Sequence, residues 1–129
     1  MDINETIQQA DLVLSTRTSD DRNPDASDDP RWLAIIAVGE FIDTHPEDIW
    51  QFILRWSTKA DDDLRDALAT CLLEHLLEWH FSDYFPKVEA WALSDPGAAI
   101  VFRRSSRLGY ADLPGNRERF DALTARVAR

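Results

Sequence analysis

Two carboxylates and two imidazoles fall within two turns of a predicted helix, in the segment Glu74-His75-Leu76-Leu77-Glu78-Trp79-His80. Glu74 and Glu78 are four residues apart and share one helix face, and His75 precedes Glu78 by three residues. Carboxylate oxygens and imidazole nitrogens are ordinary metal ligands, so these three side chains could converge on one ion. A metal-dependent enzyme that uses Glu74, His75 and Glu78 is therefore one hypothesis for the function.

The spacing of this cluster departs from the metal sites that helical proteins build. Di-iron bundles draw carboxylates and Glu-x-x-His pairs from several helices. Zinc proteases use two histidines four residues apart, with a glutamate next to the first. No second predicted helix of this chain offers a matching set, and no metal or other cofactor is predicted.

The alternative for His75 is a structural role. It shares a predicted apolar stripe, which favours a buried histidine with a backbone or carboxylate partner. The stripe consists of Leu64, Leu68, Cys71, Leu72 and Trp79. Glu74 and Glu78 are then predicted to pair with basic side chains, for which the candidates are Arg103, Arg104 and Arg107.

Nucleophilic catalysis and nucleotide binding are not indicated either. No serine lies in a glycine-flanked nucleophile elbow, and the four glycines are too scattered to form a phosphate-cradling loop. Cys71 is the only cysteine, which excludes an internal disulfide, and its apolar surroundings predict a small core residue. The sequence therefore predicts a protein that is not an enzyme.

The elements that would position these residues are predicted to be helices throughout. The chain has 129 residues, of which 44% are hydrophobic, so residues 1–129 are expected to form a single domain with one core. Apolar side chains recur at helical spacing, and no segment alternates as a strand does. The predicted helices cover residues 2–15, 30–43, 46–57, 64–80, 82–94 and 96–108, with a last one around Phe120. An all-α fold of six or seven helices is expected.

Several local features refine this prediction. The helix over 64–80 is apolar on most sides and is expected in the middle of the fold. Gly39 is predicted to permit a close helix crossing, and Gly109 to cap the end of a helix. Residues 16–30 contain no large apolar side chain and many aspartates, which predicts a flexible acidic loop or linker. Trp50 falls off the apolar face of its helix and is predicted to be the exposed or secondary-interface tryptophan among the five.

One segment has the pattern of a known helical repeat. The run Asp63-Leu64-Arg65-Asp66-Ala67-Leu68-Ala69-Thr70-Cys71-Leu72 resembles the second helix of a HEAT-type repeat. The resemblance implies stacked helical hairpins in a short solenoid that presents a surface to other proteins. A compact helical bundle stays open as the alternative. The whole chain is also similar to small bacterial helical proteins, some of which serve as immunity proteins for secreted toxins.

The distribution of charge bears on the partner. Residues 1–66 contain 16 acidic and 6 basic residues, whereas residues 67–129 contain 8 of each, so the formal net charge of −10 belongs to the N-terminal half. Such a surface repels phosphates and attracts basic proteins. The sequence therefore predicts a non-catalytic interaction module, in its sharpest form an immunity or inhibitor protein that binds a basic toxin or enzyme. The candidate partner-binding residues are Asp20, Asp21, Asp28, Asp29, Glu47, Asp48, Trp50, Asp61, Asp62 and Asp63.

Two further expectations concern nucleic acid and membranes. Seven arginines against three acids from Arg103 onward allow a third hypothesis, in which the C-terminal region binds RNA or DNA, but nucleic acid is not the predicted partner. The N-terminal segment has no basic leader or continuous apolar run, and no stretch of the sequence is long and apolar enough to span a membrane. We therefore expect a cytoplasmic protein that does not bind membranes.

Overall fold

The computed structural model describes residues 1–16 and 29–128. These residues form helices and connecting turns, without a strand. The prediction of an all-α fold with six or seven helices is confirmed. The predicted acidic loop at 16–30 lies outside the described residues except at its ends, where Thr16 closes one helix and Pro30 opens the next. The elements are α1 (Ile3–Thr16), α2 (Pro30–Gly39), α3 (Pro46–Ser57), α4 (Asp62–Ala67), η3 (Leu68–Leu73), α5 (Glu74–Ser94), α6 (Pro96–Arg103), η4 (Gly109–Asp112) and α7 (Asn116–Val127).

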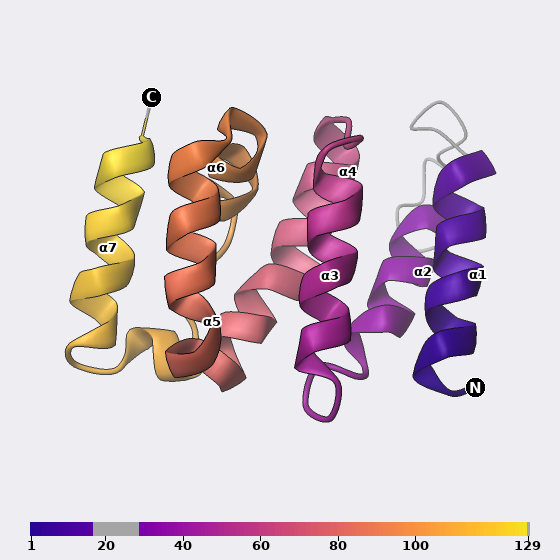
Figure 1. Ribbon diagram of the computed structural model, residues 1–129, viewed down its shortest axis with the longest axis horizontal. Helices are drawn as coiled ribbons and strands as arrows, with labels where there is room; N and C mark the ends of the chain where they lie inside the picture. Colours follow the sequence, from indigo (N-terminus) through magenta and orange to yellow (C-terminus); the bar gives the residue numbers. More distant parts are fainter. Residues whose placement is uncertain (17–28, 129) are drawn as a thin grey trace.

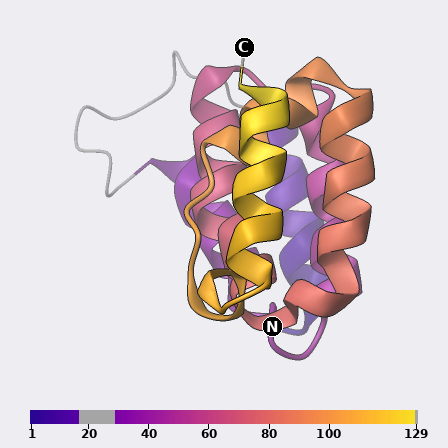
Figure 2. The ribbon, with the colours of Figure 1, turned by 90° about the vertical axis from the view of Figure 1, so that its left-hand side faces the viewer.

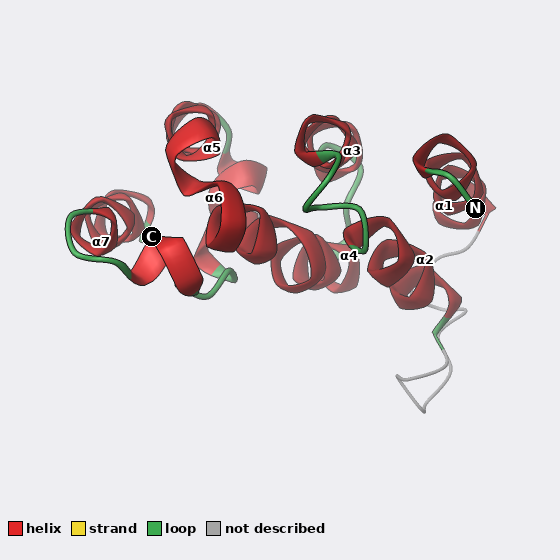
Figure 3. Ribbon diagram, turned by 90° about the horizontal axis from the view of Figure 1, so that it is seen from below, coloured by secondary structure: helices red, strands yellow, loops and turns green. Residues whose placement is uncertain are grey.

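The helices form two layers. Figure 3 shows α1, α3 and the C-terminal part of α5 in one row and α2, α4 and α6 in the other, with α7 at the end. α1 packs on α2 and α5 packs on α6, whereas α3 packs on η3 and α5. The N- and C-termini lie at opposite ends of the longest axis (Figure 1). Figure 2 looks onto the end where α7 covers the stack, in contact with α5 and α6.

Aspartates begin three of the helices. The carboxylates of Asp29, Asp61 and Asp95 each accept a hydrogen bond from a backbone N–H two or three residues later, at 2.8–2.9 Å. Asp29 and Asp95 are followed by proline at the first helical position, where the missing N–H has no cost. Each cap satisfies a backbone donor that would otherwise lack a partner, so these aspartates define where α2, α4 and α6 start.

The middle of the fold is one continuous helix made of α4, the π-helical segment η3 and the start of α5. Its leucines are at most 3% exposed, which confirms that the helix predicted over 64–80 is central. α2 crosses it closely, because a Cβ placed on Gly39 would lie 3.0 Å from the carbonyl oxygen of Cys71. The predicted close crossing at Gly39 is confirmed, and Cys71 packs partly buried against the core. The buried leucines are Leu64, Leu68, Leu72, Leu73, Leu76 and Leu77.

The helical path of α5 breaks at His80. The backbone there has φ −130° and ψ 38°, outside the helical range, so α5 consists of two helices joined by a kink. The sequence predicts that one helix ends at residue 80 and that the next begins at Ser82 or Asp83. The break at His80 therefore lies at the predicted boundary between two helices. The Nε2–H of His80 donates to the carbonyl oxygen of Ile42 at 3.0 Å, which ties the kink to the turn between α2 and α3.

The prediction for Gly109 is wrong. α6 ends at Arg103, and Gly109 begins the 3₁₀ segment η4 with a positive φ of +52° instead of capping a helix. A Cβ on Gly109 would lie 2.6 Å from Cγ and 2.8 Å from the carbonyl oxygen of Glu78. Glycine is needed here because η4 presses directly on the backbone of α5. None of the helices in the described ranges has the length and apolarity that a membrane span requires.

Candidate functional site

Glu74, His75 and Glu78 contact one another without converging on a common point. The imidazole of His75 lies between the two carboxylates, with Nδ1 2.8 Å from Oε1 of Glu78 and Nε2 3.9 Å from Oε2 of Glu74. The Oε1 of Glu74 accepts from the backbone N–H of Ser106 at 2.9 Å. Over residues 1–16 and 29–128, no group of three or more His, Cys, Asp and Glu side chains is arranged to hold a metal ion.

Two predictions about this segment are wrong because of the π-helix. The side chain of His75 is 40% exposed and Trp79 is 56% exposed, although the stripe predicted both to be buried; the carboxylate partner predicted for His75 is present, as Glu78. A π-turn takes up one residue more than an α-turn, which rotates everything after it by about 100° about the helix axis. After η3 the buried stripe therefore continues through Leu76 and Leu77, and Trp79 faces outward.

The three arginines predicted as partners of Glu74 and Glu78 have other contacts. Arg104 pairs with Asp62 at 3.3 Å and with Asp66 at 3.1 Å. Arg107 pairs with Asp112 and Asp121, whose carboxylates raise the pKa of its guanidinium. The guanidinium of Arg103 donates to the carbonyl oxygen of Val127 at 2.7 Å. Glu74 instead accepts a hydrogen bond from the backbone N–H of Ser106, which lies in the same segment as these arginines.

Among the described residues, most of the aspartates predicted to bind a partner have structural roles. Asp29 is 1% exposed and caps α2. Asp61 accepts from Arg31 at 3.1 Å, and Asp63 accepts from the indole N–H of Trp32 at 3.2 Å. Asp62 is 79% exposed and pairs with Arg65 and Arg104. The three predicted residues that lie outside the described part of the chain are Asp20, Asp21 and Asp28.

Glu47 and Asp48 are exposed, as predicted, and three more acids join them. The hydrogen bond from His80 to Ile42 brings the kink of α5 beside the turn between α2 and α3, at the lower edge of the molecule in Figure 1. We call the resulting group of exposed carboxylates the acidic end surface, and its members are Glu40, Asp43, Glu47, Asp48 and Asp83.

The acidic end surface is only slightly neutralised from within. Lys87 contacts it, with Nζ 3.4 Å from Oε1 of Glu47. Glu40, Asp43, Asp48 and Asp83 form no side-chain hydrogen bond or ion pair with any described residue. The surface therefore has a strong negative potential that a partner can use.

Tyr84 links this surface to the core. Its hydroxyl donates to Oε1 of Glu47 at 3.0 Å, while its ring is 6% exposed. Burial, the hydrogen bond to Glu47 and the charges of Glu47, Asp83 and Asp48 together raise the pKa of Tyr84 to about 12. The pKa of Glu47 is lowered because its carboxylate accepts hydrogen bonds from Gln51, Tyr84 and Lys87. The geometry thus keeps Tyr84 neutral and Glu47 ionised.

Alkaline pH is expected to destabilise the fold through Tyr84. The folded state holds the phenolic proton of Tyr84 up to about pH 12, whereas an unfolded tyrosine releases it near pH 10. The contribution of Tyr84 to the free energy of unfolding is therefore fully present below pH 10 and is lost between pH 10 and 12. The loss should approach roughly 2 kcal/mol. Urea unfolding of the wild type and Tyr84→Phe across this range measures it. A wild type and variant that lose stability in parallel would show that Tyr84 is not responsible.

Of the two alternatives predicted for Trp50, exposure is wrong, and the side chain lies instead at a second interface of α3, with α5. Trp50 is 4% exposed and meets the rings of Tyr84 and Trp91 edge to face, with centroids 6.3 and 5.4 Å apart. α3 contacts both η3 and α5, so it buries a wider face than the single stripe that defined the prediction. The strongly exposed tryptophan is Trp79.

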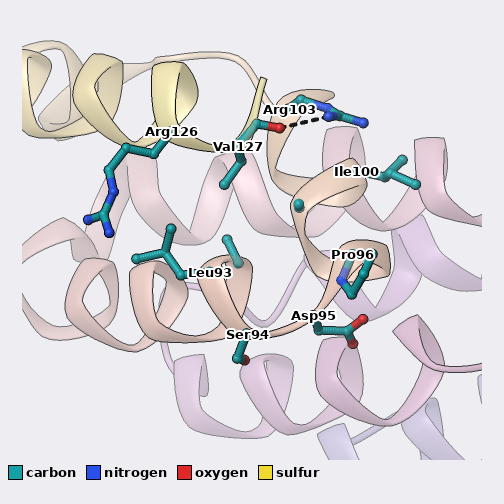
Figure 4. A pocket seen from close by; sticks show the side chains of 10 residues that line it. Leu93, Ser94, Asp95, Pro96, Ile100, Arg103, Arg126 and Val127 are labelled. Atoms are coloured by element: carbon teal, nitrogen blue, oxygen red, sulfur yellow. Dashed lines mark hydrogen bonds between the residues drawn. The ribbon is translucent and has the colours of Figure 1, made fainter. Parts of the chain in front are cut away.

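A cavity of about 470 Å³ lies between the end of α5, α6 and α7. Figure 4 shows Leu93, Pro96, Ile100 and Val127 along it. Its two guanidinium groups extend in different directions, and Arg103 is bound to the carbonyl of Val127 (Figure 4). A small-molecule site normally has polar groups that converge on the ligand, and this cavity does not have that arrangement.

Comparison with known proteins found no matching family model, no similar curated protein and no similar solved structure. Function therefore has to follow from the residues and their arrangement. The acidic end surface is the feature with the clearest chemical consequence, because it concentrates unneutralised charge on two connected segments.

Proposed function

We propose that this protein is a non-catalytic binding module that holds a basic protein partner on its acidic end surface. The observation that carries the proposal is the grouping of five exposed carboxylates with one contacting lysine. Charge of one sign on one end of a protein speeds the encounter with an oppositely charged partner and selects against acidic ones. The formal net charge of −10 acts in the same direction over longer distances.

The scaffold is suited to this role. The turn between α2 and α3 is fixed at both sides, since its carbonyl at Ile42 is bound by His80 and Glu47 is bound by Tyr84. A surface held in one conformation loses little conformational freedom on binding. The helices also lie in two layers, and stacked helical layers such as those of HEAT-type repeats present surfaces to other proteins.

The sharpest form of the proposal is an immunity or inhibitor protein that binds a basic toxin or enzyme. Inhibition by simple occlusion requires a small, rigid protein that binds quickly, and electrostatic steering provides the speed. The partner should then lose its activity when this protein is added in a one-to-one ratio. A partner that binds tightly yet stays fully active would support a binding module and contradict inhibition.

We expect capture of the partner to depend steeply on salt. The tagged protein is incubated with a lysate of the source cells at low salt, and bound proteins are eluted by raising the salt concentration and identified by mass spectrometry. A stoichiometric basic protein should elute early in the gradient, because added ions screen charges that act over more than about 10 Å. Retention of an acidic protein, or of a partner that resists high salt, would contradict the proposal.

A further inference from the structure

Large apolar side chains are exposed next to the acidic end surface. Trp79 of α5 is 56% exposed, Tyr110 of η4 is 51% exposed, and Leu113 just beyond η4 is 46% exposed. They come from separate segments that meet because Gly109 presses on the backbone of Glu78. The fold therefore groups these three side chains in one place without burying them. We call Trp79, Tyr110 and Leu113 the aromatic groove.

The aromatic groove contains two adjoining hollows that share Trp79 and Tyr110. The first, about 280 Å³, is mainly apolar and reaches Leu113, with Glu78 and Gly109 completing its wall. The second, about 210 Å³, is more polar, because His80, Ser82 and Asp83 line it together with the two rings. A partner side chain that enters the first, apolar hollow therefore lies next to the second hollow, whose lining is more polar.

The second hollow connects the aromatic groove to the acidic end surface. Asp83 belongs to both, and its charge acts on Tyr84 together with those of Glu47 and Asp48. The guanidinium of Arg119 lies over the rings of Phe81, which also lines this hollow, and Phe85, at 5.7 and 5.0 Å. The carboxylate of Asp83 makes no ion pair with a described residue, so it can accept one from a partner.

We propose that a basic segment of the partner docks in the aromatic groove, with an aliphatic side chain in the hollow beside Leu113 and a neighbouring arginine or lysine over Trp79 and Tyr110, facing Asp83. The inference rests on the proposed function, because the acidic end surface is what selects a basic partner. Aromatic faces attract cations, and tryptophan and tyrosine are the residues that most often dominate binding energy at protein interfaces. The aromatic groove thus supplies affinity while the acidic end surface supplies steering.

Three model peptides of equal length test the aromatic groove. The first repeats arginine and leucine with glycine spacers, the second has glycine in place of leucine, and the third has glutamate in place of arginine. Binding to the ¹⁵N-labelled protein is followed by NMR, with the indole N–H signal of Trp79 identified by its loss in Trp79→Phe. The variants are Trp79→Ala and Tyr110→Ala, and the matched control is Leu33→Ala, an exposed apolar side chain on α2.

The first peptide should shift the Trp79 signal saturably, the second should bind about tenfold more weakly, and the third should cause no shift. Tyr110→Ala should weaken the first peptide by about tenfold or more, and Leu33→Ala should leave its binding unchanged. Shifts confined to the backbone signals of Asp43 and Asp48 would overturn the aromatic groove while leaving the proposed function standing. Equal binding of the third peptide would overturn the cation's part in the inference. If no peptide shifts any signal, both proposals are contradicted.

Discussion

Replacing Gly109 with alanine is expected to lower the free energy of unfolding by roughly 3–4 kcal/mol, a large effect for one methyl group. Part of the loss is backbone strain, because a residue with a Cβ at φ +52° costs about 1–2 kcal/mol. The rest is steric, since the added Cβ would lie 2.8 Å from the carbonyl oxygen of Glu78. Urea unfolding of Gly109→Ala against the wild type measures the loss.

Gly115 provides a matched control for Gly109. It also has a positive φ, +88°, but a Cβ placed there has no heavy atom within 4 Å. Gly115→Ala should therefore lose only the backbone part, about 1–2 kcal/mol. If the two variants are equally destabilised, the contact between η4 and α5 does not constrain Gly109. In that case, the placement of Tyr110 beside Trp79 would need another explanation.

The second large effect is expected on removing Arg31. Its side chain is 5% exposed and lies 3.1 Å from Asp61 and 4.0 Å from Asp63. Arg31→Ala takes a buried cation away from two carboxylates, one of which, Asp61, caps the start of α4, and should cost about 3 kcal/mol or more. The expected result is a clear drop in the urea midpoint with an unchanged slope.

Arg104→Ala is the control for Arg31. Arg104 also pairs with two aspartates, Asp62 and Asp66, but those carboxylates are 79% and 51% exposed, so water screens the interaction. Arg104→Ala should therefore lower the free energy of unfolding by less than about 1 kcal/mol. If Arg31→Ala and Arg104→Ala lower the free energy of unfolding equally, then burial does not strengthen the ion pairs of Arg31.

Much of the fold could be predicted because its signals are local. Asp29-Pro30 and Asp95-Pro96 begin helices where the sequence indicates, since cap and proline preferences act within a few residues. The leucine-rich central helix was recognisable because its apolar residues exceed one stripe. Gly39 lies at a close crossing, which is what a lone glycine inside an apolar helix face indicates.

The errors concern features that depend on contacts between distant segments. Nothing in the leucine-rich segment distinguishes a π-turn from an α-turn, so the predicted stripe continued to Trp79 and placed it inside. Trp50 is buried because α5 covers a second side of α3, which the periodicity of α3 alone does not reveal. Glycine is required at position 109 because the backbone there packs directly on Glu78, which is distant in the sequence.

The candidate site was predicted in part. Glu47 and Asp48 belong to the acidic end surface, whereas Asp29, Asp61 and Asp63 cap or pair within the fold. Their positions just before or at helix starts indicate this role from the sequence alone, because such aspartates favour capping. The membership of Asp83 depends on the hydrogen bond between His80 and Ile42, and no sequence pattern predicts that contact.

The measurement that tests the account most directly is the affinity of the captured basic partner for two double variants with equal loss of charge. Asp43→Asn/Asp48→Asn removes two carboxylates from the acidic end surface, and Asp62→Asn/Asp66→Asn removes two from α4, which lies at the opposite edge in Figure 1. The first variant should weaken binding about tenfold at low salt, mostly through a slower association rate, and the second should change it by less than about twofold. Equal weakening, or weakening by the second variant alone, would contradict the assignment of partner binding to the acidic end surface.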